Sequence, residues 1–275
     1  MTLMKKILHN PQAMTGLTLI SLLLLVALLA DVLAPHDPMQ QDLQGKYSAP
    51  SLEYPLGTDQ LGRCELSRLI YGTRYSLGIS LPVVAVLGLV GLLLGCFSAC
   101  APKAVQWTVQ YLCNVFVAFP AVVLAAALTG VIGNGLFATV CAVLLAMWAW
   151  FVRMVRGYAL VELGKDYPLA CRMAGCGTLR LVWRHLIPNI LPQYLVYMST
   201  GVASSVIMLS GFAFLGMGFS AGTPEWGAML NEARRGLYAH PALLIYPGLC
   251  VAATACAFNL FGEALRDILE NTEGR

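Results

Sequence analysis

The chain has 275 residues, of which 58% are hydrophobic and 11% are charged, and its net charge is +3. A soluble domain carries roughly a quarter charged residues, so this composition, with its mean hydropathy of +0.72, excludes a soluble globular protein. The small net charge gives no support to nucleic-acid binding. The composition therefore predicts an all-α integral membrane protein.

Six apolar segments are long enough to cross the hydrocarbon layer, which needs about 20 residues per helix. The fourth segment ends early, because Trp148 and Trp150 are typical of a membrane interface and Arg153 follows at once. The predicted spans are residues 14–33, 77–100, 112–133, 136–152, 191–216 and 243–265.

The first span follows Lys5 and Lys6, as the apolar core of a signal peptide would. Its apolar run is longer than a signal core, so we expect residues 14–33 to stay as a membrane helix after a tail of residues 1–13. Placing both termini in the cytoplasm puts the larger share of Lys and Arg inside, as the positive-inside rule requires. Residues 266–275 are then a second cytoplasmic tail.

Residues 34–76 are expected to form an external loop. Its second half, from Pro55 to Leu77, reads PLGTDQLGRCELSRLIYGTRYSL. Thr58 or Asp59 can cap a following helix, and an apolar stripe from Glu65 onward predicts a short helix on the membrane surface. By itself this loop fits a lid, a packing element or a docking ledge. Its candidate residues are Gly57, Thr58, Asp59, Gly62 and Arg63.

A long polar segment, residues 153–190, separates the fourth and fifth spans. Between Lys165 and Gly175 it reads KDYPLACRMAG, with small apolar residues four apart, which predicts a short amphipathic helix. Gly175 and Gly177 are typical helix stops. Such a helix either docks in a groove on a partner protein or lies on lipid headgroups. The candidate docking residues are Asp166, Tyr167, Leu169, Ala170, Arg172, Met173, Ala174, Gly175 and Arg180.

Small and polar residues mark two of the spans. Gly91 and Gly95 in the second span, and Gly201 and Ser205 in the fifth, have the spacing of close helix contacts. The fifth span is also rich in hydroxyl groups, which can line a wet path without the cost of burying charge. Single hydroxyls in membrane helices often bond to their own backbone instead. The candidate path residues are Ser204, Ser205 and Met208.

Catalytic and metal-binding patterns are missing from the sequence. The four histidines are scattered, no H-E-x-x-H or C-x-x-C occurs, and no G-x-x-x-x-G-K-[ST] is present. The chain is therefore not expected to hydrolyse ATP, to bind a metal or cofactor, or to form disulfides. Near the end of the last span, Arg266 is expected to pair with Glu263 or Asp267, with a contact to a partner ATPase as the alternative.

Three segments together resemble one family, the dipeptide, oligopeptide and nickel permeases of bacterial ABC importers. Residues 55–77 are similar to its external-loop signature, except that Cys64 replaces an aspartate. Residues 214–230 and 257–267 are similar to its C-terminal segments. Residues 165–188 resemble the "EAA" loop, which forms the coupling helix of ABC permeases. The usual glutamate is absent from that loop, and Asp166 is the nearest acid.

The resemblance implies a type I permease with six membrane helices, in which residues 77–265 form a five-helix core with a cytoplasmic coupling loop at 153–190. It is closest to the second-subunit type. It implies a paralogous permease as heterodimer partner and two ATPase subunits that hold ATP and Mg. It also implies an extracytoplasmic binding protein, a shell of membrane lipid, and a place in the bacterial inner membrane.

The expected cargo is nickel, as the ion or a chelate, because residues 148–156 and 226–234 are closer to nickel permeases than to peptide permeases. Dipeptides or oligopeptides are the alternative. A secondary transporter would need ionisable residues at the bilayer midplane, and an intramembrane enzyme would need paired catalytic groups there. The predicted spans offer neither pattern.

Overall fold

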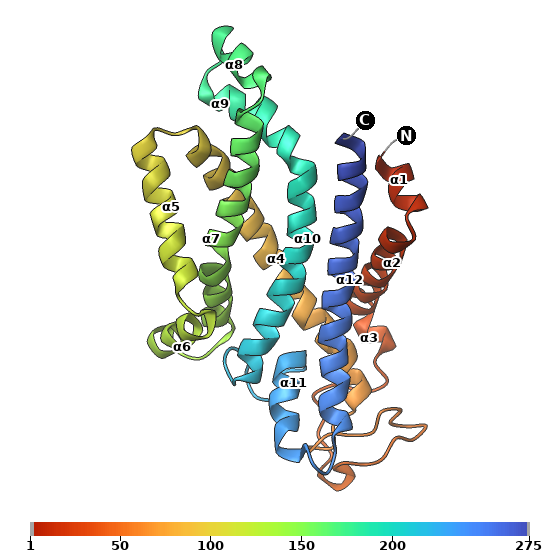
Figure 1. Cartoon of the computed structure of the whole chain (residues 1–275). Coiled ribbons are helices and arrows are strands. Elements are labelled where there is room, and N and C mark those ends of the chain that lie inside the picture. Colours follow the sequence, from red (N-terminus) through yellow and green to blue (C-terminus); the bar gives the residue numbers. More distant parts are fainter. Residues whose placement is uncertain (1–2, 274–275) are drawn as a thin grey trace.

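The computed structural model describes residues 3–273, and every regular element in that range is a helix. Two short 3₁₀ turns, Leu43–Gly45 and Arg234–Gly236, and one π-helical turn, Val182–Leu186, complete the set. The α-helices in Figure 1 are α1 Leu3–His9, α2 Pro11–Leu28, α3 Ala30–Leu33, α4 Glu65–Cys100, α5 Lys103–Ala118, α6 Ala121–Ile132, α7 Leu136–Leu163, α8 Asp166–Met173, α9 Thr178–Leu181, α10 Ile187–Phe214, α11 Trp226–Ala233 and α12 Ala242–Glu273.

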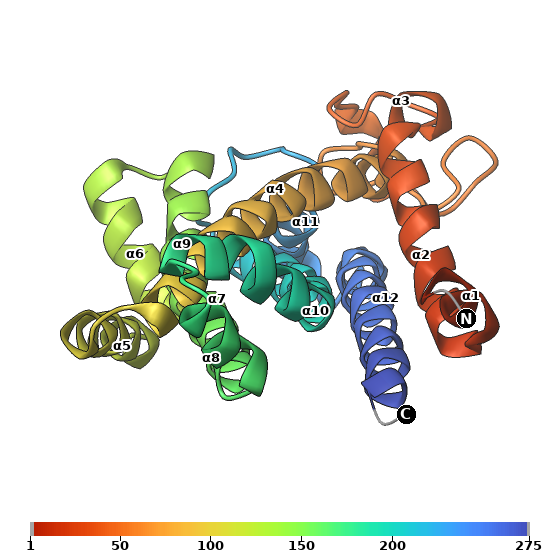
Figure 2. The same cartoon turned by 90° about the horizontal axis from the view of Figure 1, so that it is seen from above.

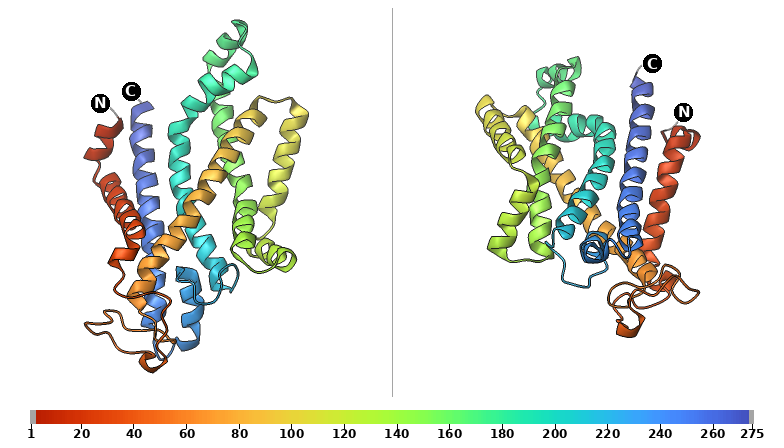
Figure 3. Two further views of the ribbon diagram at one scale, coloured as in Figure 1. Left: turned by 180° about the vertical axis from the view of Figure 1, so that it is seen from behind. Right: turned by 60° about the horizontal axis from the view of Figure 1, so that its bottom comes forward.

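The bundle has two distinct ends. Helices α8 and α9 and both ends of the chain lie at one end, whereas α11 and the loop between α3 and α4 lie at the other (Figure 1). From above, α2 and α12 stand at one edge and α5 and α6 at the opposite edge (Figure 2). The long α4 runs obliquely across the bundle between them (Figure 3). This arrangement agrees with the predicted all-α membrane fold.

The predicted third span, residues 112–133, is not one straight helix. It covers the end of α5 and all of α6, which meet at an angle of 88°. Pro120 causes the break, because proline has no N–H to donate and forces Phe119 out of the helical region, to φ −82° and ψ 128°. By length and composition, the described residues contain five helices able to cross a membrane, or six if this bent pair counts as one.

Several helices extend beyond the predicted spans. Helix α7 continues to Leu163 and α10 begins at Ile187, so much of the predicted loop 153–190 is helical. The surface helix expected from Glu65 is not separate, since it forms the first turns of α4. Apolar runs locate the part of a helix inside lipid. A helix can continue from lipid into water, because it forms its own backbone hydrogen bonds. Its residues outside the lipid are polar, so hydropathy does not show where the helix ends.

Glycines allow the central helices to approach closely, as their spacing predicted. A Cβ atom on Gly91 would lie 2.8 Å from Cβ of Phe151, and one on Gly95 would lie 2.6 Å from Cβ of Val155, where α4 crosses α7. A Cβ on Gly201 of α10 would meet the same Phe151 ring at 2.7 Å. These contacts hold α4, α7 and α10 in one core.

Candidate functional site

The short helix α8 is present and ends where its glycine predicted. The N–H of Gly175 donates to the carbonyl of Arg172 at 3.0 Å, and that of Cys176 donates to Cys171 at 2.9 Å. Gly175 has a φ of +79°, which completes the paired hydrogen bonds of a Schellman turn. Gly177 takes no part in this stop and instead precedes α9 as its N-cap residue.

One face of α8 is largely exposed among the described residues. Leu169 is 64% exposed and Met173 is 83% exposed, and four apart they form the apolar face that the sequence predicted. Because α8 projects from the bundle, this apolar pair is accessible at its end (Figure 1). Of the other predicted docking residues, Tyr167 is half-buried, whereas Asp166, Ala170, Arg172, Ala174, Gly175 and Arg180 are exposed.

Helix α8 is fixed to the bundle through Glu162, which is not among the predicted residues. This carboxylate, buried at the end of α7, forms an ion pair with Lys165 and accepts a hydrogen bond from the Tyr167 hydroxyl at 3.0 Å. The Asn189 side chain at the start of α10 lies near the Tyr167 hydroxyl. Burial raises the pKa of Tyr167, so the phenol stays protonated and able to donate. The root of α8 therefore joins α7 to α10.

The chain re-enters the bundle through a π-helical turn. Val182 and Leu186 at its ends are both buried, and Pro188 follows in the first turn of α10. A π-helical turn is wider than an α-helical one and is held by longer-range hydrogen bonds, so it is rare and often placed at functional positions. It lies directly between α9 and α10.

At the opposite end, a buried cluster of ion pairs joins the loop between α3 and α4, and the first turn of α4, to α11. Arg63 bonds to Asp59 at 2.6 Å, and Arg68 bonds to Glu232 at 2.9 Å. Arg63 also pairs with Glu232, and Arg68 donates to the carbonyl of Gly222 at 3.1 Å. Both arginine side chains are only 1% exposed. Buried charges of this kind need all their partners, so the cluster fixes the loop to α11.

A second set of buried contacts lies beside this cluster. The indole N–H of Trp226 donates to the carbonyl of Leu69 at 3.1 Å. Glu225 caps α11 by accepting from the N–H of Ala228 at 2.9 Å, and it also accepts from the hydroxyls of Ser76 and Ser210. Burial raises the pKa of Glu225. The two segments that resemble family signatures are thus in direct contact.

The predicted loop residues shape the turn before α4. Gly57 and Gly62 have φ values of +78° and +74°, and a Cβ on Gly62 would lie 1.7 Å from the carbonyl oxygen of Asp42. Thr58 donates to the carbonyl of Gly45 at 2.5 Å. The expected capping of α4 by Thr58 or Asp59 is wrong, because the N-cap residue is Cys64 and its side chain caps nothing. Asp59 instead binds Arg63.

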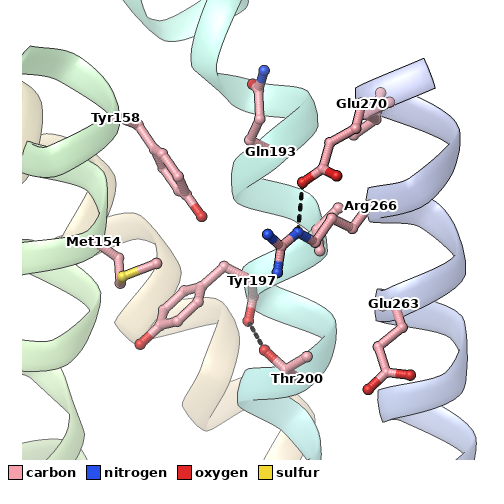
Figure 4. A pocket seen from close by; sticks show the side chains of 11 residues that line it. Met154, Tyr158, Gln193, Tyr197, Thr200, Glu263, Arg266 and Glu270 are labelled. Atoms are coloured by element: carbon pink, nitrogen blue, oxygen red, sulfur yellow. Dashed lines mark hydrogen bonds and ion pairs between the residues drawn. The ribbon is translucent and has the colours of Figure 1, made fainter. Parts of the chain in front are cut away.

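An open cavity of about 550 Å³ lies between α7, α10 and α12, at the end of the bundle that carries α8 (Figure 4). Arg266 pairs with Glu270 at 2.7 Å along α12, whereas Glu263 or Asp267 was the expected partner. The polar side chains that face the cavity are Tyr158, Gln193, Tyr197, Thr200, Glu263, Arg266 and Glu270.

The three predicted path residues on α10 do not share one face. Ser204 is exposed and Met208, four residues later, is half-buried. Ser205 lies in the core, 1% exposed, on the side where Gly201 packs against Phe151. Thr200 precedes Ser204 by one turn and accepts the Ser204 hydroxyl on its carbonyl at 3.1 Å. Thr200, Ser204 and Met208 therefore form one row along α10.

Within residues 3–273, no group of three or more His, Cys, Asp or Glu side chains is placed to hold a metal ion.

Asp31 on α3 bonds to Arg74 at 2.9 Å and to the Tyr71 hydroxyl at 2.6 Å, and the Arg74 guanidinium lowers the pKa of Asp31. This contact holds α3 against α4 near the external loop.

Residues 91–273 match the family described as "Binding-protein-dependent transport system inner membrane component". Residues 2–50 match the N-terminal membrane domain of oligopeptide transport permease C. The first match covers the end of α4 and the elements from α5 to α12, and the second covers α1 to α3 with part of the loop before α4.

Three named transport permeases are similar to this chain over nearly their whole length. The chain is 35% identical to the nickel transport system permease protein NikC of Escherichia coli K12, covering 93% of this chain and 92% of the relative. It is 36% identical to the di/tripeptide permease DppC of Pseudomonas aeruginosa, covering 95% and 88%. It is 33% identical to the metal-staphylopine permease CntC of Staphylococcus aureus, covering 97% and 92%.

These matches agree with the all-α membrane fold. They exclude the secondary transporter and the intramembrane enzyme, since the chain is a multi-pass inner-membrane subunit without the ATPase activity of its complex. The chain belongs to the family of inner-membrane components of binding-protein-dependent transport systems, the permease subunits of ABC importers.

Proposed function

We propose that this chain is a pore-forming subunit whose helix α8 is the coupling helix that ATPase subunits bind. The main observation behind this proposal is the exposed pair Leu169 and Met173, which forms an apolar surface on a helix that is fixed to the bundle. The support is the contact of Glu162 with Tyr167 and Lys165. Movement of an ATPase subunit would be passed through this contact to α7 and α10 together.

The end of the bundle that carries α8 and both termini is then cytoplasmic, and the end with α11 is external. Two ATPase subunits hold ATP and Mg on the cytoplasmic side. A paralogous permease completes the pore as a heterodimer within the lipid. The external loop and α11, joined by the buried ion pairs of Arg63 and Arg68, offer a firm ledge for the substrate-binding protein.

We place the translocation path along the row of α10 that carries Ser204 and Met208. This face is accessible in the single chain, as a pore shared by two subunits requires. Ser205 faces the core from the other side of the helix and contributes to its packing, although the sequence placed it on the path.

We propose nickel, as the ion or a chelate, as the first candidate cargo, and short peptides as the second. The relatives named for nickel and for di/tripeptides share 35% and 36% identity with this chain, which supports both. The relative named for metal-staphylopine supports a metal chelate as an intermediate case.

Uptake by the assembled importer tests this function. We expect ATPase activity only when this chain, its paralogue and the ATPase subunits are made together, and ATP-driven uptake when the binding protein is added. Parallel assays with labelled nickel, nickel with histidine, and labelled dipeptide identify the cargo. An assembly that moves none of the three, or that moves them without ATP, would contradict the proposal.

A further inference from the structure

The cavity between α7, α10 and α12 has the size and position of a binding site. Its volume of about 550 Å³ lies within the roughly 300–1,000 Å³ that is usual for small-molecule sites. Its lining residues lie near the end of α7, the start of α10 and the end of α12, so the cavity is at the end of the bundle that carries α8 (Figure 1). The next question is which chemistry its walls would recognise.

The wall formed by α12 carries both signs of charge. Arg266 and Glu270 form an ion pair of 2.7 Å, and their side chains are 70% and 62% exposed. An ion pair this exposed contributes little to stability, so a ligand can replace either partner at low cost. Glu263, one turn before Arg266, adds a second carboxylate at the same wall.

The opposite walls are uncharged. Tyr158 on α7 points its hydroxyl across the cavity toward Arg266, and Met154 lies below it (Figure 4). On α10, Tyr197 and Thr200 line the cavity, and the Thr200 hydroxyl donates to the carbonyl of Tyr197 at 2.9 Å. A molecule in this space would meet charged groups on one side, and aromatic and hydroxyl groups on the other.

The cavity continues into the proposed translocation path. Thr200 lines the cavity and begins the row of α10 that passes through Ser204 to Met208, each four residues from the last. Residues four apart lie on the same face of a helix. A solute moving inward along this row would therefore reach the cavity next.

We propose that this cavity is the inner binding site for the transported solute and that it selects zwitterions of the amino-acid type. The carboxylate of the solute binds Arg266, and its ammonium binds Glu270 or Glu263. A bare divalent cation could bind the carboxylates but would leave Arg266 without an anionic partner, whereas a short peptide or an amino-acid chelate of a metal carries both charges. The inference rests on the proposed function and narrows its cargo.

Photolabelling of the assembled importer in nanodiscs tests the site. The probe is the dipeptide alanyl-p-benzoylphenylalanine, and mass spectrometry locates the adducts. We expect adducts within residues 154–158, 193–200 and 262–270. Alanyl-alanine should compete about tenfold better than alanyl-alanine amide, which lacks the carboxylate that Arg266 would bind. Nickel chloride alone should not compete.

Arg266→Gln makes the test specific. We expect this variant to lose the tenfold preference for the free carboxylate, so that the acid and the amide compete equally. Arg153→Gln is the matched control, because Arg153 is an exposed arginine on α7 outside the cavity, and it should keep the preference. A variant with merely altered packing would weaken both competitors alike and leave their ratio unchanged.

Three results would overturn the inference: adducts confined to other segments, competition indifferent to peptide charge in the unaltered protein, or labelling that follows the phosphatidylethanolamine content of the nanodisc. ATP-driven uptake is measured in the same preparation with binding protein present. Uptake without charge selection in the cavity defeats only this inference. Absence of any ATP-driven uptake defeats the proposed function itself.

Discussion

The hydroxyl of Tyr167, in the first turn of α8, lies 3.0 Å from the buried carboxylate of Glu162 at the end of α7. With the Asn189 side chain also near this hydroxyl, the contact connects the projecting helix to α7 and to the start of α10. The resembled loop usually places a glutamate within its own helix, which this chain lacks. Here the buried acid comes from α7 instead.

Tyr167→Phe is expected to weaken coupling without removing the ATPase subunits. The variant loses a hydrogen bond to a charged group, an interaction that contributes about 1.5–3 kcal/mol, and leaves Glu162 held by Lys165 alone. We expect ATP hydrolysed per solute imported to rise several-fold, measured with both assays on one preparation. Tyr238→Phe, at a fully exposed position, should leave the ratio unchanged. If Tyr167→Phe left the ratio of ATP hydrolysed to solute imported unchanged, the contact between Tyr167 and Glu162 would not be needed for coupling.

Met173→Asp is expected to release the ATPase subunits. Met173 is 83% exposed, so the fold does not depend on it, but a charge buried in a protein contact without a partner is strongly unfavourable. We expect the ATPase subunits to be lost when the complex is purified through a tag on this chain. Leu52→Asp, at an exposed position of the opposite end, is the matched control and should retain them. Retention in both variants would place the docking surface elsewhere.

Gly175 can be tested through its backbone alone, because no atom lies within 4 Å of the position that a Cβ would take. At φ +79°, a β-branched residue is strained, and left-handed backbone costs about 1–2 kcal/mol for ordinary residues. Gly175→Val should therefore fray the end of α8 and lower uptake, whereas Gly175→Asn, which tolerates this backbone, should keep most of it. Equal uptake by both variants would show that the stop is not needed.

Glu232→Ala is expected to destabilise the fold, because Glu232 is the shared partner of Arg63 and Arg68 in the buried ion-pair cluster. Glu232→Ala leaves the buried guanidiniums of Arg63 and Arg68 without this partner, and breaking a buried ion pair in this way costs about 3–5 kcal/mol. We expect a clear fall in the thermal midpoint of the purified complex. Asp31→Ala breaks the exposed pair with Arg74 and should change it little. If both variants changed the thermal midpoint by the same small amount, water would be replacing Glu232 as the partner of the two arginines.

Hydropathy predicted the membrane helices because it depends only on local composition. The 88° bend at Pro120 was missed since the residues on both sides stay apolar, although the proline itself was the signal. The helix stop at Gly175 was predictable for the same local reason. By contrast, Arg68 and Glu232 are 164 residues apart, and nothing local in the sequence joins them. The burial of Ser205 was not predictable, because hydroxyl content does not reveal which face of α10 packs against the core.

Cys64→Asp is expected to stabilise the protein by restoring a cap that α4 lacks. Cys64 is the N-cap residue, its backbone has the extended geometry of a cap, at φ −63° and ψ 115°, and its side chain accepts no hydrogen bond. An aspartate there can accept from the free N–H groups of the first turn, which contributes typically about 1 kcal/mol. Arg68, one turn on and buried, would also favour the added charge. The thermal midpoint of the complex should rise for Cys64→Asp and stay unchanged for Cys64→Ala. A fall with aspartate would show that Asp59 and Glu65 already supply all the negative charge that this end of α4 can hold.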